Sequence, residues 1–145
     1  MPVFDTNIVI DYINGNAKAA DELGRCSDRL ISIMSWMEIL VGCNTIDKEQ
    51  QVIEWMAAFF DVVYIDDEIA AQAVNIRRDL RLKLPDAVIL ATAHHHKTVL
   101  ITRDRKDFPL SVRPSAFLMI FSVISYLTSR RLSVYSTSLS RHYLY

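Results

Sequence analysis

Short apolar runs alternate along the chain with longer segments whose apolar residues recur at the helical period. The runs show little alternation, as expected for strands buried on both faces, and are Pro2–Phe4, Leu30–Ile33, Val62–Ile65 and Thr98–Ile101. Helices are predicted between them, at Thr6–Ile13, Ala17–Gly24, Ser35–Cys43, Asp47–Phe60, Asp66–Lys83 and Leu84–Ala93. Strands that alternate with helices in this way predict an α/β fold, a three-layer sandwich with a mostly parallel central sheet flanked by helices.

Acidic residues stand where several of these elements begin or end. Asp5 and Asp104 directly follow apolar strands, and Glu38 lies one helical turn beyond the strand that ends at Ile33. Asp86 is the one charge at the start of a helix that is otherwise apolar on every side. Because functional crevices in parallel sheets lie outside the carboxyl ends of the strands, we expect these four acids to gather at one edge.

This set of acids predicts a particular chemistry. Oxygen ligands without Cys or His nearby select a hard cation, Mg²⁺ or Mn²⁺. Carboxylates crowded together without a cation repel one another, so that some of their pKa values should rise. A bound divalent ion activates water and stabilises the attacking and leaving oxygens of a displacement at phosphorus.

Each acid also has a purely structural explanation. Glu38 follows Ser35 by three residues, which is the spacing of a capping box. Asp5 can cap the helix that follows it, and Asp86 can complement a helix dipole. Asp104 and Asp107 lie in a polar run that is also typical of a solvated turn.

Composition divides the chain of 145 residues near Pro109. Residues 1–109 carry 12 basic and 17 acidic side chains, whereas residues 110–145 contain four Arg, nine Ser, no Lys and no acid. We therefore predict one domain over 1–109 and an atypical basic, Ser-rich segment over 110–145. Its apolar part, Ala116–Leu127, could form an edge strand or a packed helix before a poorly ordered tail. A change of reading frame near Pro109 would also explain the break.

The remaining features set the compartment and exclude other sites. Cys26 and Cys43 lie in no zinc or disulfide spacing, and no signal peptide is expected, so the chain is predicted to be cytoplasmic. Residues 116–127 are too few to cross a membrane. The consecutive residues His94–His96 point in different directions on a helix and are not expected to bind metal.

Four motifs in this order resemble those of a known family. Phe4-Asp5-Thr6-Asn7, Ser35-Trp36-Met37-Glu38, Pro85-Asp86-Ala87-Val88 and Leu100-Ile101-Thr102-Arg103-Asp104, the last continuing to Phe108, are similar to the acidic motifs of PIN-domain proteins, in particular VapC-type toxins. The resemblance runs from about Pro2 to Pro109. It implies a metal-dependent endoribonuclease, usually a homodimer, held inactive by a cognate antitoxin.

The resemblance assigns roles residue by residue. Asp5, Glu38 and Asp86 match the first three acids, with Thr6, Asn7 and Thr102 as supporting residues. The fourth acid is ambiguous, because both Asp104 and Asp107 match positions that family members use. We favour Asp104 because it is nearer the strand end, and keep Asp107 as an alternative metal ligand.

An RNA substrate also needs cations beside this acidic edge. Arg103, Arg105 and Lys106 adjoin the fourth acid and are candidate phosphate contacts. A second basic group at the end of a helix, residues 77–83, is explained as well by dipole complementarity. The alternative function is a catalytically silent PIN-like module that only binds in a protein complex. A receiver-type signalling domain fits less well, because adjacent acids after the first strand and a Lys after the last strand are both missing.

Overall fold

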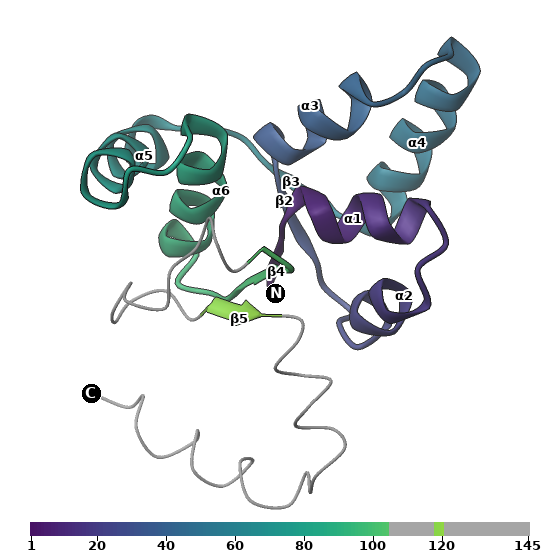
Figure 1. Cartoon of the computed structure of the whole chain (residues 1–145), viewed down its shortest axis with the longest axis horizontal. Helices are drawn as coiled ribbons and strands as arrows, with labels where there is room; N and C mark the ends of the chain where they lie inside the picture. Colours follow the sequence, from purple (N-terminus) through teal and green to yellow (C-terminus); the bar gives the residue numbers. More distant parts are fainter. Residues whose placement is uncertain (105–117, 121–145) are drawn as a thin grey trace, which may run out of the picture.

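A parallel sheet forms the centre of the computed structural model, which describes residues 1–104 and 118–120 (Figure 1). Its five described strands lie in the order β3-β2-β1-β4-β5, and every neighbouring pair is parallel. The strands are β1 (Val3–Phe4), β2 (Leu30–Ser32), β3 (Asp61–Val63), β4 (Leu100–Thr102) and β5 (Leu118–Ile120). The chain adds strands on one side of β1 and then reverses, so that β1 and β4 are neighbours at the switch point.

The register of the strands sorts their side chains into two layers. Val3 pairs with Leu30 and Leu100, and these three buried side chains contribute to one core cluster. The next residues along each strand, Phe4 with Ile31 and Ile101, belong to the second cluster. Because successive side chains of a strand point to opposite faces, a sheet covered on both faces needs apolar residues throughout, as the sequence has.

Six helices cover the two faces of the sheet among the described residues. Figure 1 shows α5 and α6 on one side and α1 to α4 on the other. The helices are α1 (Thr6–Ile13), α2 (Ala17–Gly24), α3 (Ile33–Val41), α4 (Ile46–Phe59), α5 (Asp67–Leu80) and α6 (Leu84–His95). The predicted α/β sandwich with a parallel sheet is therefore confirmed. In this part of the chain no helix has the length and apolarity needed to span a bilayer.

Local capping explains most of the helix starts. Asn16, Thr45 and Asp66 each accept a hydrogen bond from a backbone N–H in the first turn of the helix that follows. Gly15 adopts a φ of +81° directly after α1, a conformation that glycine takes without steric strain. The bounds of α1 and α2 agree with the sequence prediction.

The remaining predicted bounds shift by a few residues. β3 begins at Asp61, one residue earlier than predicted, because its pairing with β2 starts at Leu30. β4 covers Leu100–Thr102, where it is bonded to β1 and β5. β5 lies within the apolar run of 116–127 and is an edge strand, one of the two alternatives for that run. The rest of that run and the predicted tail lie outside the described residues, so the boundary near Pro109 stays a prediction.

Candidate active site

Asp5 lies at the carboxyl end of the central strand β1, next to the switch point of the sheet. It is the N-cap of α1, and its Oδ1 accepts a hydrogen bond of 2.7 Å from the Thr6 N–H. Its Oδ2 accepts from Asn7 Nδ2 at 2.6 Å and from Thr102 Oγ1 at 2.5 Å. The capping explanation of Asp5 is thus correct, but one cap accounts for only one of these three donors.

Burial makes the negative charge of Asp5 unfavourable. Only 5% of the residue is exposed, and the pKa of its carboxyl is raised from 3.8 to about 6, above all because burial removes water from it. Hydrogen bonds from Thr102 and Thr6 oppose this rise, and repulsion from Asp86 and Glu38 adds to it. Three of the four predicted acids therefore lie close enough for their charges to affect one another.

Glu38 reaches the site from α3, where it is half-buried. Its Oε2 accepts a hydrogen bond of 2.5 Å from Thr6 Oγ1, which links it to the residue after Asp5. The capping-box explanation of Glu38 is wrong. α3 begins at Ile33 and is capped by Ser32, so Ser35 lies inside the helix and Glu38 is well past its first turn.

Asp86 lies in the first turn of α6, after Pro85. The N-cap position is Lys83, which makes no side-chain capping bond, so the helix begins with a proline and an acid in place of a capping side chain. Seven residues of α6 behind Asp86 are buried, from Ala87 to Ala93. This packing against the sheet is what aims the start of α6 at the same edge as Asp5.

The fourth predicted acid, Asp104, lies two residues after the end of β4. Asp104 is half-buried, and its N–H donates to Thr102 Oγ1 at 3.1 Å. The same hydroxyl accepts from Asn7 Nδ2 at 3.0 Å and donates to Asp5, so its one donor and two acceptor sites are all used. The predicted supporting residues Thr6, Asn7 and Thr102 thus all make hydrogen bonds within the site.

Asp11, which was not among the predicted site residues, pairs with Arg103, one of the predicted RNA contacts. Nη1 of Arg103 lies 2.7 and 2.6 Å from the two carboxylate oxygens of Asp11. The sequence contains one indication of this pair. Asp11 lies in the second half of α1, where the helix dipole disfavours an acid, so a cationic partner would stabilise it.

Three predicted residues, Asp107, Arg105 and Lys106, lie outside the described residues, so their part in the site stays a prediction. In the basic group at the end of α5, Arg77 donates to the Leu82 carbonyl, which is a structural contact. Between residues 1 and 104, and in β5, no three Asp, Glu, His or Cys side chains are grouped closely enough to hold a metal ion as they stand.

Comparison with known proteins identifies the family of the chain. The PIN domain family model matches residues 3–109. The chain is 31% identical over 109 residues to Ribonuclease VapC1 of Methanocaldococcus jannaschii, covering 72% of this chain and 76% of the relative.

Solved structures share the fold. A chain of a toxin-antitoxin complex from Klebsiella pneumoniae superposes with a TM-score of 0.72 at 38% identity, covering 81% of this chain and 96% of that chain. A chain of DNA-bound VapBC from Salmonella typhimurium has a TM-score of 0.70 at 19% identity, over 83% of this chain and 99% of that chain, and supports the fold alone. From the match over residues 3–109 and these likenesses, this chain belongs to the PIN domain family.

Proposed function

We propose that this chain is a metal-dependent endoribonuclease and the toxin of a toxin–antitoxin pair. The observation that carries the proposal is the buried Asp5 at the carboxyl end of β1, which is linked to Glu38 through the hydrogen bonds of Thr6 and whose pKa is raised first by burial and further by Asp86 and Glu38. The identity of 31% to a named ribonuclease supports the same activity. A purely structural role does not explain why a buried carboxylate is kept beside two others at a cost in stability.

The donor chemistry suits a divalent metal ion, which would have to draw together carboxylates that, in the described residues, are not grouped closely enough to hold one. All the candidate ligands are carboxylate oxygens, which suit Mg²⁺ or Mn²⁺, and a positive charge would offset both the burial that chiefly raises the pKa of Asp5 and the repulsion that adds to it. Asp5, Glu38, Asp86 and Asp104 would hold the ion, with Asp107 as the alternative to Asp104. When bound, such an ion lowers the pKa of a water molecule and stabilises charge on the phosphoryl oxygens.

The residues around the acids orient them for this task. Thr6 fixes one oxygen of Glu38, while Asn7 and Thr102 both donate to Oδ2 of Asp5. These donors restrict the rotation of both carboxylates before substrate arrives, which is how a site is organised in advance for a developing charge. Single-stranded or looped RNA is the proposed substrate, because its backbone can reach an open edge of the sheet.

The likeness to a solved complex supports a protein partner. The Klebsiella chain comes from a toxin-antitoxin complex, and we therefore propose a cognate antitoxin as the protein partner. A homodimer in the cytoplasm, with residues 1–109 as the nuclease domain, completes the proposal. Residues 110–145 are proposed as a separate, atypical segment.

The decisive experiment is an RNA cleavage assay with the whole chain. Fluorescently labelled single-stranded RNA is incubated with Mn²⁺ or with EDTA, using the wild type and the variants Asp5→Asn and Asp86→Asn. We expect the wild type to cleave only with metal, and neither Asp5→Asn nor Asp86→Asn to cleave. Asp21→Asn is the matched control, since it removes one negative charge from an exposed position on α2 and should cleave as the wild type does.

Other outcomes would overturn the proposal. Cleavage that persists in EDTA, or in both variants, contradicts the metal mechanism. If no form cleaves, but Mn²⁺ still binds to the wild type and not to Asp5→Asn, the silent binding module becomes the better account.

A further inference from the structure

Asp11 anchors the segment that follows β4 although it is not one of the proposed metal ligands. Its side chain is 15% exposed, and Nη1 of Arg103 contacts both of its oxygens at 2.7 and 2.6 Å. Asp11 lies in the second half of α1, where the partial negative charge of the helix end disfavours an acid. The guanidinium of Arg103 offsets this local cost, and so the pair connects two segments that are 92 residues apart.

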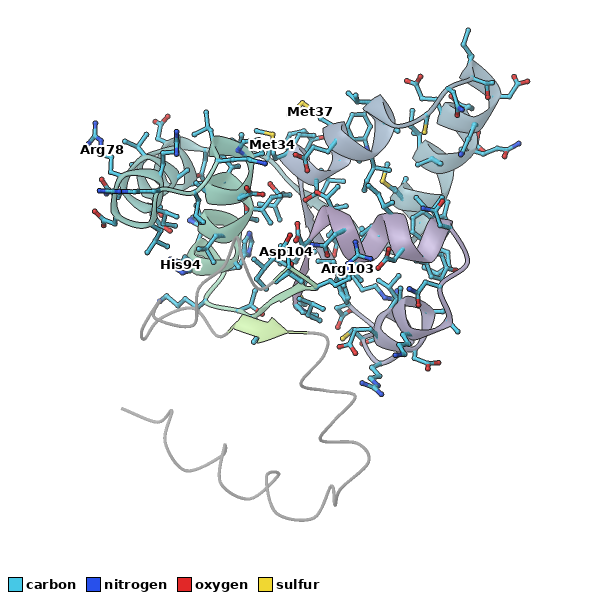
Figure 2. All side chains as sticks on the ribbon, in the orientation of Figure 1. Met34, Met37, Arg78, His94, Arg103 and Asp104 are labelled. Atoms are coloured by element: carbon cyan, nitrogen blue, oxygen red, sulfur yellow. The ribbon has the colours of Figure 1, made fainter. Side chains whose placement is uncertain are left out.

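A second contact from α1 holds the same segment. Asn7 lies one helical turn before Asp11 on the same side of α1, and its Oδ1 accepts a hydrogen bond of 3.2 Å from the Arg103 N–H. The N–H of the next residue, Asp104, is bonded to Thr102 Oγ1. Figure 2 shows Arg103 and Asp104 next to each other near α1. Both the backbone and the side chain of Arg103 are therefore attached to the helix that Asp5 caps.

We infer that Asp11 is a positioning residue, whose pairing with Arg103 fixes the segment 102–104 so that Asp104 is held at the acidic edge. This inference rests on the proposed function, because it gives Asp104 a role there. It also reassigns Arg103, which contacts Asp11 and not the RNA. An exposed ion pair alone contributes little to stability. Here Asn7 already fixes the backbone of Arg103, so less conformational freedom is lost when the pair with Asp11 forms.

The first test does not depend on activity. Backbone amide hydrogen exchange of Arg103 and Asp104 is measured by NMR in the wild type, in Asp11→Asn and in the control Asp21→Asn. We expect both amides to exchange about tenfold faster or more in Asp11→Asn, because the segment opens locally, and to be unchanged in the control. Exchange that is equally slow in Asp11→Asn would overturn the inference.

The second test separates positioning from substrate contact. Asp11→Asn and Arg103→Gln should each lower kcat by about tenfold or more with KM and its salt dependence unchanged, and the double variant should be no worse than either. Asp11→Glu, which keeps the charge, should recover part of kcat. If Arg103 instead contacts phosphate, Arg103→Gln raises KM and weakens its salt dependence, whereas Asp11→Asn frees Arg103 and lowers KM.

These two tests fail in different ways. If no form of the chain cleaves RNA, the proposed nuclease function is wrong, while the exchange measurement still decides whether Asp11 holds the segment. If the wild type cleaves and Asp11→Asn cleaves equally well, the positioning role is wrong and the nuclease function stands.

Discussion

Replacing Asp5 by Asn should remove one source of the pH dependence of the free energy of unfolding, because Asp5 titrates with a raised pKa in the folded chain. The pKa of Asp5 is raised from 3.8 to about 6, so the folded state binds this proton more tightly than the unfolded state. Stability contributed by the protonated form is therefore lost as pH rises through this window. A difference of about two pKa units corresponds to roughly 3 kcal/mol in the free energy of unfolding over the whole titration. Between about pH 4.5 and about pH 7.5 the change is about 2 kcal/mol.

The assay is urea unfolding of wild type and Asp5→Asn in EDTA at these two pH values. Asn loses part of the hydrogen bonding from Thr6, Asn7 and Thr102, but that loss hardly varies with pH and cancels when the two conditions are compared. The pKa of Glu22 is also raised by burial, and it cancels because both proteins contain it.

The sign of the result is fixed in advance. Relative to Asp5→Asn, the wild type should be less stable at about pH 7.5 than at about pH 4.5, by about 2 kcal/mol. A stability difference that stays constant between the two conditions, or that changes in the opposite direction, would refute the claim that burial and neighbouring acids raise this pKa.

Four further predictions concern metal, site and core. Mn²⁺ at about 100 times its dissociation constant should raise the unfolding free energy of the wild type by about 2.7 kcal/mol and leave Asp5→Asn nearly unchanged, in urea titrations at neutral pH. Thr6→Val should lower kcat/KM for RNA by about tenfold, because it removes the donor to Glu38, and Thr6→Ser should retain activity. Ser32→Ala should lower the unfolding free energy by about 1–2 kcal/mol, since it removes the cap of α3; no loss would show that this cap is dispensable. Met56→Ala, which deletes a fully buried side chain, should cost about 2–5 kcal/mol in the same urea assay, and a smaller cost would mean that the core collapses around the gap.

Much of the fold could be predicted because its signals are local. α1 and α2 have the predicted bounds, since Asp5 and Asn16 cap them and Gly15 ends the first. α3 shows where such signals fail. Ser32 and Ser35 are both of a residue type that favours the N-cap position, and the choice of Ser32 depends on β2, whose pairing with β3 extends to Ser32. Capping preference alone does not decide which of the two serines caps α3. The pairing of the preceding strand does.

The candidate site divides in the same way. The proximity of Glu38 and Asp86 to Asp5 could be predicted from sequence, because the carboxyl ends of parallel strands share one edge of the sheet, while the catalytic role of these acids stays a prediction. Only the tertiary structure decided that Asp11 pairs with Arg103 and that Thr102 donates to Asp5, contacts between residues 92 and 97 positions apart. The sequence predicted a raised pKa from repulsion between crowded acids, but the main cause at Asp5 is burial, and the loss of water around a carboxyl is set by the elements that cover it in the folded chain.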